Sequence, residues 1–265
     1  MVSAKTILKD RYVLHELVRK RVKAQYRNSF LGMLWTVLNP LLNMLVMWVV
    51  FKQFFGRDDP LFPVYLLCGN IMFSCFRSAT DGALQSVVNN RGLLTRVKIN
   101  PYLFPLSSTM AALVNKAFAI MALLVIMLGM QIFGGFQLFS FRMFTIFLML
   151  PAFVLFEYGI GLFLSAIYVF CRDIKYLYSV LLTLWTYLTP IFYKVDRFDV
   201  SSLAYKIVKL NPMYYFIRFF RDAMYMGWSE YPAQDLLVLY GLGVVSMIIG
   251  VVVFKLLKKH FMTNL

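Results

Sequence analysis

Long apolar blocks alternate with short polar and basic segments along most of the chain. A helix that crosses a bilayer needs about 20 mainly apolar residues, because each residue advances a helix by about 1.5 Å. Six blocks are long enough, and the third and fourth are expected to tilt or to extend beyond the bilayer. The pattern predicts an all-α integral membrane protein with six transmembrane helices, at about 33–51, 61–80, 105–133, 143–170, 176–193 and 236–257.

The segment before the first block, within residues 1–30, has the pattern of an amphipathic helix. On a helical wheel of residues 6–24, five aliphatic side chains share a broad face, which Arg11 and Arg21 interrupt. Basic amphipathic helices lie in the membrane interface. We therefore expect an N-terminal interfacial helix on the cytoplasmic side. Its aliphatic residues are Ile7, Leu14, Leu17, Val18 and Val22.

Residues 195–235 follow the fifth block and form a second amphipathic segment. Pro212 divides it into two pieces, near residues 203–210 and 213–226. Each piece is too short to cross a bilayer. We therefore expect short re-entrant or interfacial helices on the outer side, between spans five and six.

The composition fits a single transmembrane domain over residues 1–265. Apolar residues make up 61% of the chain and charged residues 15%, against about 45–50% and about 25% in soluble proteins. The net charge of +15 favours anionic lipid head groups or an anionic substrate as partners, and not nucleic acid.

Several kinds of chemistry lack the residues they need. The three cysteines form no CxxC pair, and the two histidines lie in basic terminal segments, so neither a disulfide framework nor a metal site is expected. The chain has no GxxxxGKS or GxxxxGKT phosphate loop, so it is not expected to bind ATP in that way. We predict a non-catalytic protein that holds no cofactor.

The distribution of Lys and Arg predicts the orientation, because short cytoplasmic loops carry an excess of these residues. With the N-terminus inside, sixteen Lys and Arg residues fall on the cytoplasmic side and nine on the outer side. Arg77 and Lys116 remain within spans. The asymmetry favours both termini in the cytoplasm.

A basic and aromatic run enters the first span and is a candidate substrate entrance. Arg27 offers a planar fork of donors suited to phosphate, and Tyr26 and Trp35 are aromatic residues at the level of the head groups. Asn28 and Ser29 complete the run. The alternative is ordinary interfacial anchoring, which this run supports equally well.

Two ionisable residues, Lys116 and Glu157, lie at membrane depth in the third and fourth spans. Such residues are costly there and are functional candidates. The spans run in opposite directions, so the two side chains are expected at similar depth, about 20 Å from the cytoplasmic edge. We hypothesise that they pair or that one of them lines an aqueous path. A snorkelling lysine and a structurally paired glutamate explain them equally well.

Aromatic side chains cluster at the outer end of the fifth span, around Thr189 and Pro190. Aromatic rings could stack on sugars in a channel, although a lipid-facing aromatic belt is the commoner case. The aromatic residues are Trp185, Tyr187, Phe192 and Tyr193.

The link between spans two and three, residues 82–100, is polar and basic around two leucines. It could be a contact surface for a motor subunit, but its composition alone favours a solvated loop that follows the positive-inside rule. The residues concerned are Asn89, Asn90, Arg91, Leu93, Leu94, Arg96 and Lys98.

Taken in order, the motifs of this chain resemble those of the membrane subunits of ABC-type exporters for bacterial surface polysaccharides: O-antigen, capsule and teichoic acid. The match extends over nearly the whole chain and is more specific than any single motif. It rests on residues 26–35 (YRNSFLGMLW), Asn39-Pro40, residues 169–174 (VFCRDI), residues 189–193 (TPIFY), residues 211–213 (NPM) and residues 220–222 (FRD).

The resemblance implies a homodimeric permease, in a bacterial cytoplasmic membrane, bound to two copies of a separate ATPase that holds ATP and Mg²⁺. It implies that residues 89–98 dock on the ATPase as a coupling helix, in place of the solvated loop favoured by composition. It also implies that short outer helices close the exit. The expected substrate is a glycan carried on the membrane lipid undecaprenyl diphosphate.

On this basis each candidate residue has an expected role. Arg172 and Asp173 join the entrance with Tyr26, Arg27, Asn28, Ser29 and Trp35. Glu157 and Lys116 join the aromatic residues in the channel, and Arg218 and Arg221 help an anionic group to leave. An exporter of drugs or small lipids with the same architecture is the first alternative, and a membrane-embedded glycosyl- or phosphotransferase is the second.

Overall fold

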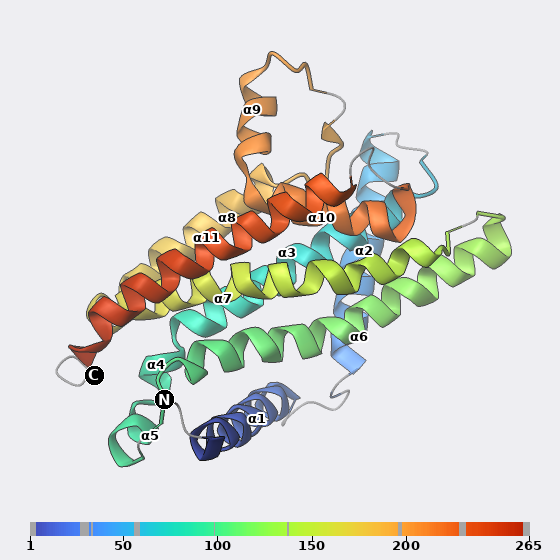
Figure 1. Ribbon diagram of the computed structural model, residues 1–265. Coiled ribbons are helices and arrows are strands. Elements are labelled where there is room, and N and C mark those ends of the chain that lie inside the picture. The colour runs from blue at the N-terminus through green and yellow to red at the C-terminus, as the bar shows by residue number, and fades with distance from the viewer. Residues whose placement is uncertain are drawn as a thin grey trace.

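The structure is a computed structural model that describes residues 4–26, 32, 34–55, 59–97, 99–136, 138–195, 198–227 and 232–261. Within these ranges every regular element is a helix and no strand occurs, as predicted (Figure 1). The first half of the chain forms α1 (Ala4–Tyr26), α2 (Leu34–Phe55), α3 (Phe62–Leu84), α4 (Ser86–Asn89), α5 (Arg91–Arg96) and α6 (Leu103–Gly134). The second half forms the 3₁₀ turn η1 (Phe141–Thr145), α7 (Ile146–Phe170), α8 (Ile174–Leu188), α9 (Leu203–Leu210), α10 (Pro212–Arg221), the π-helical turn η3 (Asp222–Met226) and α11 (Pro232–Lys258).

Three stretches of the described chain are long and apolar enough to cross a membrane: α6, the stretch Phe141–Phe170 and α11. The apolar part of α2, Leu34–Val50, is shorter. The 15 residues of α8 measure about 22 Å, against about 30 Å for the hydrocarbon core. The count of six spans therefore remains a prediction.

The helix expected at 176–193 ends earlier, at Leu188. The Thr189 hydroxyl donates a hydrogen bond to the Trp185 carbonyl at 2.7 Å, and Pro190 has no amide hydrogen to continue the helical ladder. Residues 189–193 consequently form a turn. The segment beyond it contains two short helical pieces, α9 and α10 with η3, as the division at Pro212 predicted.

The closest helix pair is α7 with α11, and glycines make this approach possible. A Cβ atom at Gly250 would overlap the backbone of Gly159, and a Cβ at Gly243 would lie 2.7 Å from the Ala152 carbonyl oxygen. Small residues allow helix backbones to approach in this way in membranes. The Ser246 hydroxyl adds a hydrogen bond of 2.9 Å to the Phe156 carbonyl oxygen.

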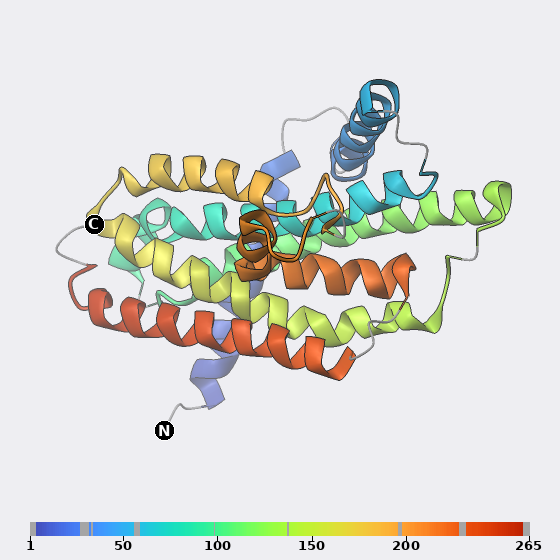
Figure 2. The same cartoon turned by 90° about the horizontal axis from the view of Figure 1, so that it is seen from above.

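The centre of the bundle is formed by α3, with α6, α7 and α10 packed around it. The apolar face of α10 is fully buried, and its Phe216 ring lies 5.2 Å from Phe153 and 5.1 Å from Phe156 of α7. The short α10 packs against α3 and α7, and its apolar side chains form part of the core (Figures 1 and 2).

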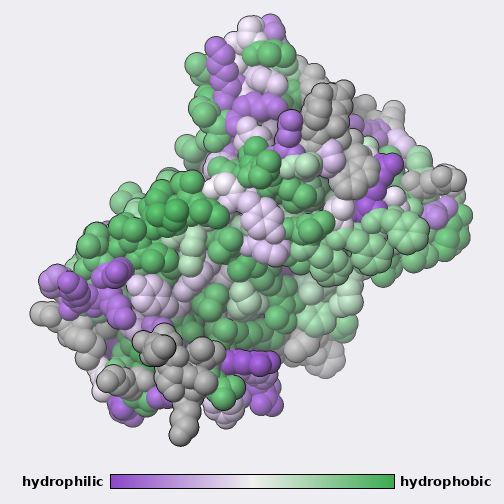
Figure 3. All heavy atoms as spheres, viewed as in Figure 1, coloured by the Kyte–Doolittle hydropathy of each residue, from purple (hydrophilic) through white to green (hydrophobic). Residues whose placement is uncertain are grey.

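Large apolar side chains are exposed on the outer faces of the long helices. Val125 of α6 and Val180 of α8 are 71% and 68% exposed. In the viewed face, hydrophobic residues cover the middle of the molecule, and hydrophilic residues gather near its extremities (Figure 3). A soluble monomer rarely exposes apolar surface of this extent, so these faces fit contact with lipid or with other protein.

Candidate functional site

A cavity of about 690 Å³ lies between α1, α2, α3 and α6. It forms because α1 packs across the first turns of α6, where Leu17 contacts the cluster of Leu103 and Phe104, while small residues of α6 leave space beside it. We call it the α1 cavity. Its wall consists of Arg21, Ala24, Gln25, Trp35, Thr36, Asn39, Pro40, Ser78, Ser108, Ala111, Ala112, Asn115 and Lys116.

Two hydrogen bonds tie α1 to the wall of the α1 cavity. The Arg21 guanidinium donates to the Gly82 carbonyl of α3 at 3.4 Å. The Asn115 amide of α6 donates to the Gln25 side-chain oxygen at 2.6 Å. Burial lowers the pKa of Arg21, but a guanidinium remains protonated in proteins. A positive charge is therefore fixed on this wall.

Lys116 contributes a second positive charge to the cavity. Its ammonium group donates a hydrogen bond of 2.7 Å to the Ser74 hydroxyl of α3. Among the residues that line the α1 cavity, all within the described chain, none is acidic. The wall therefore combines two cations with neutral hydrogen-bonding groups.

Glu157 lies on α7 and is fully buried. Within the described part of the chain, neither oxygen of its carboxyl group has a hydrogen-bond partner. Cys75 and Lys116 are its electrostatic neighbours, but no ion pair joins Lys116 to Glu157 in the described structure. Lys116 is instead directed to Ser74 and to the cavity, and Glu157 does not line that cavity.

The expected entrance residues are only partly brought together. Trp35 lines the α1 cavity. Arg172 and Asp173 lie in the turn between α7 and α8, where the Arg172 guanidinium is 5.3 Å from the Tyr168 ring, and neither lines that cavity. Arg27, Asn28 and Ser29 lie outside the described residues, as does the side chain of Tyr26.

The four expected channel aromatics do not share one face in a single chain. Trp185 points into the core, where it contacts Phe76 and donates a 2.8 Å hydrogen bond to Asn211. Tyr187 is 69% exposed. In the turn after α8, Phe192 packs against the core and the Tyr193 hydroxyl donates to the carbonyls of Tyr187 and Leu188.

The exit role expected for Arg221 does not fit its position. Its side chain is buried, with 4% exposure, and its guanidinium donates to the carbonyl oxygens of Tyr65, Pro190 and Ile191 at 2.8–3.3 Å. The guanidinium also lies 3.4 Å from the centre of the Tyr65 ring. The resemblance implied a residue that helps an anionic group to leave, but α3 and the turn after α8 enclose the guanidinium. Arg221 is a structural tie between these elements.

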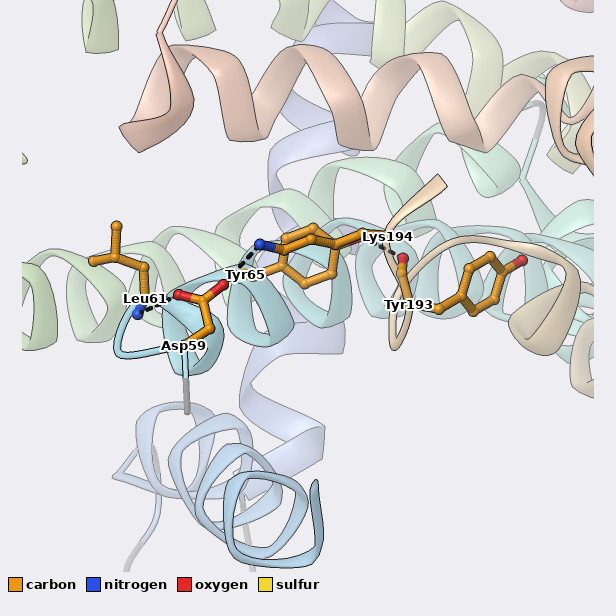
Figure 4. Close-up of polar contacts among 5 residues, drawn as sticks. All are labelled: Asp59, Leu61, Tyr65, Tyr193 and Lys194. Atoms are coloured by element: carbon orange, nitrogen blue, oxygen red, sulfur yellow. Dashed lines mark hydrogen bonds and ion pairs between the residues drawn. The ribbon is translucent and has the colours of Figure 1, made fainter. Parts of the chain in front are cut away.

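A second polar tie joins the same two elements, as Figure 4 shows. The Lys194 ammonium lies 2.7 Å from the Asp59 carboxylate, and the Tyr65 hydroxyl donates to the Tyr193 carbonyl. We call Asp59, Tyr65, Lys194 and Arg221 the Tyr65 cluster. Arg218, the other expected exit residue, is more exposed and lies 3.7 Å from Asp222.

The expected coupling residues lie on α4 and α5, which follow α3. Leu93 and Leu94 pack against the cluster formed by Leu17, Leu103 and Phe104, so α5 and α1 share one apolar contact region. The basic side chains of this segment are exposed, and Lys98 lies outside the described residues. The segment also includes Asn89, Asn90, Arg91 and Arg96.

Arg21, Ser74 and Asn115 belong to the candidate site but were not predicted as site residues. The only sequence signal was that Arg21 interrupts the apolar face of the first helix. Within the described chain, no group of three or more His, Cys, Asp and Glu residues could hold a metal ion.

Comparison with known proteins gives the family. The model of the ABC-2 type transporter family matches residues 12–225. The chain belongs to the ABC-2 type transporter family. The match includes α1 from residue 12 onward, the α1 cavity and the Tyr65 cluster.

Several relatives within this family have stated roles. An O-antigen export system permease protein RfbA from Myxococcus xanthus is 30% identical over 239 residues, which cover 90% of this chain and 88% of the relative. A protein of the same name from Klebsiella pneumoniae is 26% identical over 92% of both chains. A polysialic acid transport protein KpsM from Escherichia coli is 20% identical over 96% of this chain and 97% of the relative.

Proposed function

We propose that this chain is the permease subunit of an ATP-driven exporter of a lipid-linked polysaccharide across a bacterial cytoplasmic membrane. The observation that carries the proposal is the similarity to the O-antigen export permease, which extends over 90% of the chain. The proposed cargo is a glycan, such as O-antigen, capsule or teichoic acid, on undecaprenyl diphosphate. The exposed apolar faces of the long helices support a multi-pass membrane protein, for which we propose that both termini are cytoplasmic.

In this proposal the chain itself does not hydrolyse ATP. A separate ATPase binds ATP and Mg²⁺, and two copies of it dock on α4 and α5 of a permease homodimer. Because α5 and α1 share one apolar contact region, a push on α5 reaches α1 and the wall of the α1 cavity. The nucleotide-driven movement is thereby transmitted to the α1 cavity.

The remaining expected residues take their parts on the same path. The basic run at Tyr26, Arg27, Asn28 and Ser29 with Trp35, and the turn at Arg172 and Asp173, form the entrance. The glycan moves along the dimer seam, for which α8 offers exposed apolar side chains, Tyr187 among them. Trp185, Phe192 and Tyr193 support that wall from the core side, and Arg218 lies at the exit.

The first test is capture of the ATPase partner. The tagged chain is extracted from its native membrane in a mild detergent, and the eluate is assayed for ATP hydrolysis. We expect a stoichiometric ATP-hydrolysing partner, which is lost in the double variant Arg91→Glu/Arg96→Glu. Lys206→Glu on exposed α9 is the matched control and keeps the partner.

A chain that elutes alone, without ATPase activity even after cross-linking in the membrane, contradicts the proposal. ATPase activity that is stimulated by simple hydrophobic compounds, and not by a lipid-linked glycan, indicates an exporter of drugs or small lipids instead.

A further inference from the structure

We propose that the α1 cavity binds the phosphate group of a lipid between Lys116 and Arg21. Two lipids offer this chemistry: a bilayer phospholipid and a polyprenyl diphosphate that carries the glycan. The second source rests on the proposed function, whereas the first does not. The site differs from the entrance predicted from the sequence, because neither Lys116 nor Arg21 was part of that entrance.

The charge of the cavity wall is the first argument. Lys116 and Arg21 are both partly buried, and within the described residues each donates a hydrogen bond only to a neutral oxygen, Ser74 Oγ and Gly82 O respectively. Within the described residues no carboxylate lines the cavity or forms an ion pair with either cation. Partly buried charges are costly unless they are paired. An anion in the cavity would compensate both.

The donors that remain on these two side chains are the second argument. An ammonium group has three donors and a guanidinium has five, so one hydrogen bond leaves most of them available. A phosphate group accepts charge-assisted hydrogen bonds from such donors more strongly than a neutral ligand does. The volume of about 690 Å³ lies within the usual range of ligand cavities, about 300–1,000 Å³.

The position of the cavity indicates a lipid rather than a free anion. The 32 residues of α6 measure about 48 Å, which exceeds the hydrocarbon core by about 18 Å. Lys116 lies about 20 Å from the start of α6, so an overhang of about 18 Å on the side of α1 brings its ammonium group close to head-group level. The hydrogen bond from Asn115 to Gln25 places this part of α6 beside α1. Basic amphipathic helices such as α1 lie at head-group level. Trp35, 38% exposed, adds an interfacial aromatic ring to the wall.

The test is lipid binding to the full-length chain in detergent, measured by native mass spectrometry. The probes are a phosphatidylglycerol, a polyprenyl diphosphate and neutral diacylglycerol, and inorganic pyrophosphate serves as a competitor. The variants are Lys116→Gln, Arg21→Gln and their double variant. Lys116→Arg keeps the charge, and Lys255→Gln, at an exposed position of α11, is the matched control.

We expect one phosphate-bearing lipid per chain. Each glutamine variant should bind it with an affinity lower by at least about tenfold, because each loses a charge-assisted hydrogen bond. Lys116→Arg and Lys255→Gln are expected to bind as the wild type does. Competition by pyrophosphate supports recognition of the phosphate itself. A variant that has lost its fold is identified by its melting curve, and Lys116→Arg then separates loss of charge from loss of fold.

The lipid source follows from the same data. Preference for the polyprenyl diphosphate assigns the site to the exported lipid. Preference for phosphatidylglycerol assigns the site to a bilayer phospholipid. The proposed function is then tested separately, by capture of the ATPase partner. The proposal is overturned if diacylglycerol binds as tightly as the phosphate-bearing lipids, or if the double variant binds all of them as the wild type does.

Discussion

The α1 cavity and the Tyr65 cluster both contain basic side chains, but the partners of these side chains differ. In the Tyr65 cluster, Arg221 is buried and bonded to three carbonyl groups, and Lys194 is paired with Asp59. In the α1 cavity, Lys116 and Arg21 face an open space with only neutral partners in the described structure. A cation with complete partners holds helices together, whereas a cation that has no ion pair and faces a cavity is suited to a ligand.

The largest expected difference between the two regions comes from removing one cation in each. Arg221→Met leaves the carbonyls of Tyr65, Pro190 and Ile191 buried without a donor, and is expected to cost about 3 kcal/mol or more. Lys116→Met removes a charge that forms no ion pair in the described structure and is expected to change stability by less than about 1 kcal/mol. Melting temperatures in one detergent measure both. Equal losses in the two variants would contradict this distinction.

Two glycines of α3 offer a matched pair for the same comparison. A Cβ at Gly69 would lie 2.6 Å from the Arg221 guanidinium and 3.3 Å from the Ile191 backbone, whereas a Cβ at Gly82 would meet Ser108 and Arg21 at 3.5 Å and 3.6 Å. Gly69→Ala is expected to cost about 1–3 kcal/mol by overpacking. Gly82→Ala is expected to be neutral, or stabilising by up to about 1 kcal/mol. Thermal unfolding that shows the reverse order would exclude the tight packing around Arg221.

We expect a pH dependence of stability from Asp222, which follows Arg221 of the Tyr65 cluster. Partial burial raises the pKa of Asp222 to about 6, although Arg218 opposes the rise. Because this folded-state pKa exceeds the ordinary value of 3.8, the folded state binds the proton more tightly. Stability is therefore expected to increase as the pH falls from 7 towards 4, by about 1 kcal/mol or less after solvent screening. Melting curves at pH 7 and pH 5 measure this change.

Asp222→Asn should show a smaller change in stability between pH 7 and pH 5 than the wild type does. An unchanged response in the variant would assign the titration to another group. Lipid binding in the α1 cavity should not follow Asp222, because this residue does not line that cavity.

The smallest expected effect is that of the ion pair in the Tyr65 cluster. Lys194 and Asp59 are each 36% exposed, and exposed pairs contribute about 0–1 kcal/mol. Lys194→Gln should therefore lower the melting temperature only slightly, and high salt should reduce the difference. A loss as large as that of Arg221→Met would show that Lys194 carries the tie instead.

The sequence predicted the all-helical fold because the apolar blocks and the break at Pro212 are local signals. It also placed Arg21 on the face of the first helix that became the cavity wall. It could not predict the partner of Lys116, since helix rotation decides whether the ammonium meets Glu157 or Ser74. Nor could it distinguish buried Arg221 from a surface residue, because the carbonyls that bind it come from α3 and the turn after α8, distant in sequence.

The channel residues show the same limit at shorter range. Trp185 and Tyr187 are adjacent aromatic positions in the sequence pattern, yet residues two apart on a helix do not share a face. The first is therefore in the core and the second is exposed. Residues that cluster in the sequence therefore lie in two different environments in the structure.

The most direct measurement is ATP-dependent movement of a labelled lipid-linked oligosaccharide across proteoliposomes that contain this chain and its captured ATPase. Wild-type permease is compared with Lys116→Gln, after both proteins have been shown to melt at the same temperature and to bind the ATPase equally. The wild type should move the lipid when ATP is present, and the variant should do so at least about tenfold more slowly. Transport by the variant at the wild-type rate would contradict a role for the α1 cavity in binding the exported lipid.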